Sequence, residues 1–94
     1  MRIFGTEIKI VEHDGPANEE VYGTWSHAKQ TISLKKDITR DMRAVCMLHE
    51  IVHAVDNYMV DIRLEETQVE KIATGLYAVL KENGIDIDKL ADLK

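Results

Sequence analysis

The sequence is poor in the residues of disulfide-linked, nucleic-acid-binding and membrane-spanning proteins. It holds one cysteine, which cannot form an internal disulfide, and neither an apolar leader nor an apolar run long enough to cross a bilayer. Twelve basic residues against 17 acidic ones give a net charge of -5, with no basic cluster longer than Lys35-Lys36. These shortages predict a cytoplasmic protein that binds neither nucleic acid nor membranes.

Proline and glycine are also scarce, with one and five residues. No flexible linker, repeat or low-complexity segment therefore divides the chain. Ninety-four residues can bury only one small core, which a bound metal would supplement. We expect residues 1–94 to form a single domain, and the sequence leaves its oligomeric state open.

The first third of the chain has the composition of short strands. Apolar residues alternate within residues 2–11, which predicts one strand or two short ones before a turn at residues 13–16. Residues 21–25 and 30–34 predict further strands, joined as a hairpin by the loop 26–29. The expected product is a small sheet of about three strands, rich in antiparallel pairs.

Three helices are expected after the strands, which makes the fold class α+β. Apolar residues recur every three or four positions, and capping residues stand where the helices should begin and end. The helices are expected to run from an N-cap of Thr39 or Asp37 to Tyr58, from Leu64 to Asn83 before Gly84, and through a short segment capped by Asp86 or Asp88.

Both long helices carry an apolar stripe that should face the core. The first stripe should hold its helix against the sheet, and the second should point inward from its own helix. The expected core positions are Ala44, Met47, Leu48, Ile51 and Val55 on the first helix, and Val69, Ile72, Ala73, Leu76, Val79 and Leu80 on the second.

His49-Glu50-Ile51-Val52-His53 is the most informative segment of the chain. Four residues advance a helix by about 400°, so His49 and His53 share one face and can bind the same ion. Glu50 lies about 100° from His49, beside the metal. This HExxH pattern on a helix is typical of zinc peptidases, in which the glutamate acts as general base.

A catalytic zinc usually has three protein ligands, so a third donor is expected elsewhere. The first turn of the second helix supplies the candidate Glu66, because twelve residues after His53 allow the chain to turn back over the metal. Glu65 and Glu70 are the alternatives. Asp56 shares the face of the histidines and is a candidate alternative ligand or a residue that orients a ligand.

Such a site predicts hydrolysis of peptide bonds. The zinc ion would lower the pKa of a water molecule toward about 7, and Glu50 would take the proton of that water and pass it to the leaving amine. The reaction also needs a hydrogen-bond donor for the oxyanion. The candidate donors are Tyr22, His27, Tyr58 and Tyr77.

Three segments resemble the zincin metallopeptidases, and more closely the short phage and prophage zincin-like proteins related to the ImmA/IrrE metallopeptidases. The resemblance implies a minimal zincin that binds one Zn²⁺ and acts on a protein or peptide substrate. It also implies that His49, His53 and a downstream glutamate are the ligands and that Glu50 is catalytic. The three segments are Tyr22-Gly23 with residues 29–34, residues 48–54, and Glu65-Glu66 with residues 73–80.

Two other readings of the same motif are possible. The small size leaves little room for a substrate-binding lobe, which suits a non-catalytic, metal-stabilised phage accessory or binding protein with the same fold. A zinc protease that acts on DNA-crosslinked proteins, as SprT-like zincins do, is disfavoured by the acidic balance of the chain.

Overall fold

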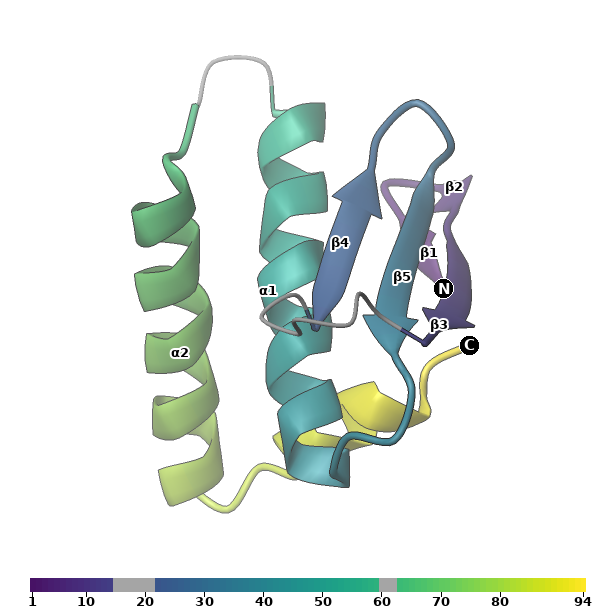
Figure 1. Cartoon of the computed structure of the whole chain (residues 1–94). Helices are drawn as coiled ribbons and strands as arrows, with labels where there is room; N and C mark the ends of the chain where they lie inside the picture. The colour runs from purple at the N-terminus through teal and green to yellow at the C-terminus, as the bar shows by residue number, and fades with distance from the viewer. Residues whose placement is uncertain (15–21, 60–62) are drawn as a thin grey trace.

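The computed structural model describes residues 1–14, 22–59 and 63–94, and within these ranges the chain is an α+β fold, as predicted (Figure 1). A small sheet, helix α1 and helix α2 lie side by side in that order, and the two chain ends meet beside the sheet. The elements are β1 (Arg2–Ile3), β2 (Thr6–Glu7), β3 (Lys9–His13), β4 (Gly23–Ser26), β5 (Thr31–Lys35), α1 (Arg40–Tyr58), α2 (Glu66–Glu82) and the 3₁₀ helix η1 (Ile87–Asp92).

The main sheet has the order β3-β5-β4 and is mixed. Strand β4 forms the predicted antiparallel hairpin with β5, but β3 pairs with β5 in parallel, so the expected antiparallel-rich sheet is only half correct. The reason is that the hairpin places β5 in the middle of the sheet, and β3 joins its free side running in the same direction. Strands β1 and β2 form a separate antiparallel pair.

Part of the predicted strand region lies outside the described residues. The turn expected at residues 13–16 falls there in part, and its first residue, His13, ends β3 instead of belonging to the turn. Residue 21 of the second expected strand and residues 60–62 of the connector between the long helices are also outside the described ranges.

Helix α1 has the predicted limits. The side chain of Thr39 caps it by accepting a hydrogen bond from the Met42 backbone, which satisfies one of the free donors of the first turn. Ala44 and Met47 are fully buried as expected, but Val55 is 36% exposed, and Ala54 takes its place in the core. One helical position turns the side chain by about 100°, which carries Val55 out toward solvent.

Helix α2 begins two residues later than predicted. Glu65 is its N-cap, and the Glu65 backbone N–H donates to the side chain of Gln68 at 2.8 Å. Only Val69 and Ala73 of this helix are buried. The remaining residues of the expected core stripe are exposed or half-buried, because α1 separates α2 from the sheet and offers it only a narrow contact; they are Ile72, Leu76, Val79 and Leu80.

Packing of the core holds the sheet, and with it β4, against α1. Ile32 and Leu34 of the central strand β5 are fully buried against Met47 of α1, and each such side chain stabilises the fold by about 1.5–3 kcal/mol before entropy is counted. Strand β4 lies beside β5 and also contacts α1, so it forms the edge of the sheet next to the histidine-bearing face of the helix. None of the helices in the described ranges is both long and apolar enough for a membrane span.

Candidate metal centre

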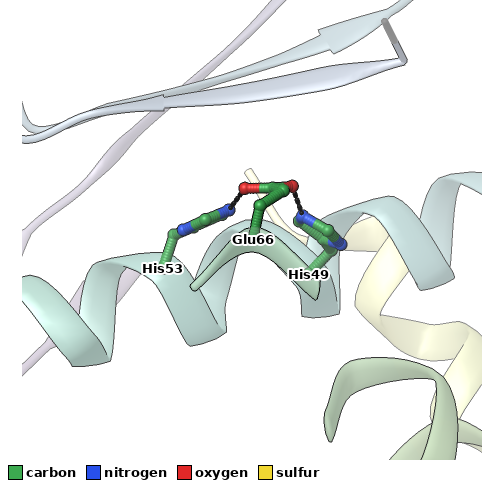
Figure 2. Close-up of side chains that lie close together, drawn as sticks. All are labelled: His49, His53 and Glu66. Atoms are coloured by element: carbon green, nitrogen blue, oxygen red, sulfur yellow. Dashed lines mark hydrogen bonds and ion pairs between the residues drawn. The ribbon is translucent and has the colours of Figure 1, made fainter. Parts of the chain in front are cut away.

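His49, His53 and Glu66 converge on one point, as Figure 2 shows. Nε2 of His49 lies 2.7 Å from Oε1 of Glu66, and Nε2 of His53 lies 2.8 Å from Oε2 of the same carboxylate. One potential ligand atom from each residue lies within 4.8 Å of the others. The arrangement is a His-His-Glu cluster with all three donors directed at a common centre.

Two helices build this cluster. The helical repeat of α1 stacks the rings of His49 and His53 with centroids 5.0 Å apart, and α2 supplies Glu66 as its first residue. Helix α2 runs back along α1 (Figure 1), and its first residue, Glu66, thereby reaches both histidines. The glutamate favoured from the sequence is the one that the fold brings to them.

The electrostatics of the cluster hold Glu66 as a carboxylate. Burial by itself would raise its pKa, but hydrogen bonds and charge from His49 and His53 outweigh that effect and leave the pKa below its usual value. The Glu66 side chain is 67% exposed, whereas the two histidine side chains are 21% and 24% exposed. The centre therefore lies at the surface of the protein, with its imidazoles partly shielded.

Glu50 is the only charged side chain that is buried in the described part of the chain, at 5% exposure. Burial raises its pKa to about 7, an effect that nearby His49 reduces and that the charge of Glu66 increases. A carboxyl group with a pKa near neutrality can both take up and release a proton, which is the property required of a general base that later acts as an acid.

A cleft of about 690 Å³ opens in front of these residues. It lies between β4, α1 and α2, and it contains the whole His-His-Glu cluster together with Glu50. Its lining is polar along α2 and partly aromatic along β4. The other lining residues are Tyr22, Gly23, Thr24, Trp25, Val45, Cys46, Asn57, Glu70 and Thr74.

The structure separates the alternative ligands from the cluster. Glu70 lines the cleft one helical turn beyond Glu66 but is not part of the convergent group. Glu65 caps α2 and does not line the cleft. Asp56 accepts a hydrogen bond from the Leu64 backbone at 3.2 Å, so it ties the chain before α2 to α1 and does not orient a histidine.

Of the four candidate oxyanion donors, only Tyr22 lines the cleft. His27 and Tyr58 pack edge to face with ring centroids 5.0 Å apart, and neither lines the cleft. The Tyr77 hydroxyl donates to Oδ1 of Asp88 at 2.5 Å and fastens α2 to η1. Tyr22 therefore remains the candidate, and His27, Tyr58 and Tyr77 have other positions.

Asn57, Thr74 and Gly23 are among the cleft residues to which the sequence assigned no role in the site. Asn57 follows His53 by one helical turn, so the spacing that identified the histidines also points to it. Thr74 follows Glu66 by eight residues and could have been found in the same way. Gly23 has no such signal, because its position depends on how the sheet packs on α1.

No protein-family model matches the chain, and neither a curated protein nor a solved structure is significantly similar to it. The resemblance to zincins is therefore carried by the motif residues alone.

Proposed function

We propose that this protein is a zinc-dependent metallopeptidase with a minimal zincin-like fold. The observation that carries the proposal is the convergence of His49, His53 and Glu66 on one point beside the buried Glu50. Buried carboxylates are rare unless they are paired or functional, and this one borders a cleft that also contains three metal-ligand side chains.

The donor set fits zinc. Two imidazole nitrogens and one carboxylate form the three-ligand arrangement of catalytic zinc sites, and the exposure of Glu66 leaves room for a further ligand from solvent. When bound, zinc would supply a Lewis acid that polarises a peptide carbonyl and a positive charge that makes water a better nucleophile. Thiolate ligands, which are typical of many structural zinc sites, are not part of the cluster.

Glu50 acts on the water in this proposal. Its carboxylate takes the proton of the attacking water and then gives it to the amine that leaves. The position of Glu50, one residue after His49 on the same helix, brings it to the side of the metal centre without competing for a ligand position. At 5% exposure the carboxylate faces the cleft and is largely shielded from bulk water.

The proposed substrate is an extended segment of another protein. Strand β4 is the edge of the main sheet in the described residues, and residues 22–25 line the cleft. An edge strand offers unpaired backbone groups with which a peptide can align. A peptide held in this way would run along the cleft in front of the metal centre.

The first test compares the native protein with Glu66→Ala and Glu50→Gln after zinc loading and desalting. Elemental analysis should find about one zinc per chain in the native protein and in Glu50→Gln, and much less in Glu66→Ala. Cleavage of a randomised library of internally quenched peptides should fall by about 10²-fold or more in Glu50→Gln. Equal cleavage by Glu50→Gln and the native protein would exclude the peptidase mechanism.

One observation favours a second function, that of a non-catalytic binding protein. The exposed apolar residues Ile72, Leu76 and Val79 recur at helical spacing on α2, as they would on a surface that binds a partner protein. For a non-catalytic binding protein, the native chain would hold zinc without cleaving peptides. Loss of zinc through Glu66→Ala would then reduce its thermal stability, whereas Glu50→Gln would leave its biological activity intact.

A further inference from the structure

The backbone conformation at position 23 does not require a glycine. Among the described residues, the glycines with positive φ are Gly5 and Gly84, and Gly23 lies in the regular strand β4. Glycine weakens a strand, because it has no side chain to pack and loses much conformational freedom on folding. We therefore looked for the reason in the side chains that lie next to residue 23.

The space beside Gly23 is occupied by Glu50 and Leu34. A Cβ atom on residue 23 would lie 3.3 Å from Oε2 of Glu50, 3.4 Å from Cγ of Glu50 and 3.2 Å from Cδ2 of Leu34. Optimal separations between carbon atoms are about 3.5–4.0 Å, so any side chain larger than hydrogen would be crowded. The backbone of β4 thus lies directly against the carboxylate.

The two neighbours differ in how easily they can move. Leu34 is the direct cross-strand partner of Gly23 and is fully buried in the core. Glu50 borders the open cleft, and none of the described residues forms a hydrogen bond with its carboxylate. Pressure from a side chain at position 23 would therefore displace the carboxylate of Glu50 in preference to Leu34.

We propose that Gly23 is a positioning residue, which holds the carboxylate of Glu50 in place by letting the edge strand close directly over it. The inference rests on the proposed function of Glu50 as general base. Packing against β4 supplies a steric constraint on the position of this carboxylate. Residue 23 thereby controls both where the carboxylate lies and how far β4 stands from the metal centre.

Substitutions at position 23 should act in proportion to their size. Catalytic groups work only when they are held within roughly 0.5 Å of the productive position, and a displacement of about 1 Å can lower the rate by about 10²-fold. Gly23→Ala should therefore lower kcat by about 10-fold and Gly23→Val by about 10²-fold. The three metal ligands lie on α1 and α2, so zinc content should stay at about one per chain.

The contact itself can be tested without metal or substrate, by a double-mutant cycle on thermal unfolding of the metal-free protein. Gly23→Ala should lower Tm by about 3–6 °C in the native background and by clearly less in the Glu50→Ala background, where only the contact with Leu34 remains. Gly75→Ala controls for an added methyl group without crowding, because its Cβ would meet nothing within 4 Å; in helix α2 it should raise Tm by the same amount in both backgrounds. An equal change of Tm for Gly23→Ala in both backgrounds would overturn the proposal.

Kinetics on the zinc-loaded protein separate positioning from a general structural effect. With one internally quenched peptide that the native protein cleaves, Gly23→Ala should lower kcat, while KM for that peptide and the zinc content stay close to native. Unchanged kcat, or a loss of zinc that parallels the loss of cleavage, would refute the positioning role. If the native protein cleaves nothing although the cycle shows coupling, the proposed function fails and the contact between Gly23 and Glu50 stands.

Discussion

Trp25 donates its indole N–H to Oδ1 of Asn57 at 2.6 Å, and this hydrogen bond joins the edge strand β4 to the last turns of α1. Both residues line the cleft, and Asn57 follows His53 by one helical turn on the face of α1 that carries the histidines. The bond therefore holds the two walls of the cleft together on the side away from Gly23.

Breaking this bond should loosen the cleft wall. Asn57→Ala removes the acceptor, and because a hydrogen bond contributes about 0.5–1.5 kcal/mol, we expect Tm to fall by about 2–8 °C. Asn57→Asp retains an acceptor oxygen and serves as the control. Circular dichroism measures Tm, and the fluorescence of Trp25, the only tryptophan, reports the change around the ring. Identical spectra and stabilities for Asn57→Ala and the native protein would contradict the assignment.

The third ligand can be distinguished from its neighbours by zinc affinity. Glu66→Gln should weaken binding by about 10²-fold or more, because it removes a charged ligand from the convergent group. Glu65→Gln and Glu70→Gln are matched controls that also remove one negative charge each, and both should change the affinity by less than about 10-fold. Competition with a chromogenic chelator measures all three. The ligand assignment would be wrong if Glu70→Gln had the larger effect.

The buried carboxyl group of Glu50 should make metal-free protein less stable as the pH rises. Burial raises its folded-state pKa from 4.5 to about 7, so between these values the folded state binds more protons than the unfolded state. The stabilisation from protonated Glu50 is complete below about pH 4.5 and lost above about pH 7. Glu50→Gln should therefore raise Tm by roughly 5 °C or more at pH 8, and by less at pH 5.

The control for this pH effect is Glu65→Gln, which alters a carboxylate at the exposed start of α2. The difference in Tm between Glu65→Gln and the native protein should not grow from pH 5 to pH 8 as it does for Glu50→Gln. If Glu50→Gln stabilised the metal-free protein equally at pH 5 and pH 8, the raised pKa of Glu50 would be disproved.

Tyr77 should matter for stability and not for the cleft. Its hydroxyl donates to Asp88 of η1 and accepts from Lys81 of the same helix at 2.9 Å, so Tyr77→Phe removes one bond between α2 and η1 and one bond within α2. We expect a fall in Tm of about 4–8 °C with unchanged zinc content and cleavage. Loss of cleavage at full zinc occupancy would instead restore Tyr77 as an oxyanion donor.

The parts of this fold that could be predicted from the sequence depend on local signals. Helix α1 has a capping threonine and a regular apolar repeat, and the two histidines have a fixed relation on any helix, so its limits and the position of His49 beside His53 were confirmed. The fold also brings Glu66 close to the two histidines, because a short connector leaves α2 few ways to return along α1, and its role as a ligand stays a prediction.

Other features depend on tertiary packing and could not be derived locally. The apolar stripe of α2 predicted a buried face, but the order of the layers leaves Ile72, Leu76 and Val79 exposed. The parallel pairing of β3 with β5 is decided by which side of the hairpin is free. Asp56 and Tyr77 had residue types suited to the site, yet the fold uses them to fasten α2.

Helix α2 buries few of its side chains, and this limited burial affects how long the protein would persist in a cell. Val69 and Ala73 are its only buried residues, so few apolar contacts oppose its separation from α1. Under the proposed function, an ion bound by His49, His53 and Glu66 would link the two helices. It would stabilise the packing of α2 on α1 in proportion to its occupancy. Zinc supply would then govern degradation as well as catalysis, because chains without the ion would expose α2 to proteases.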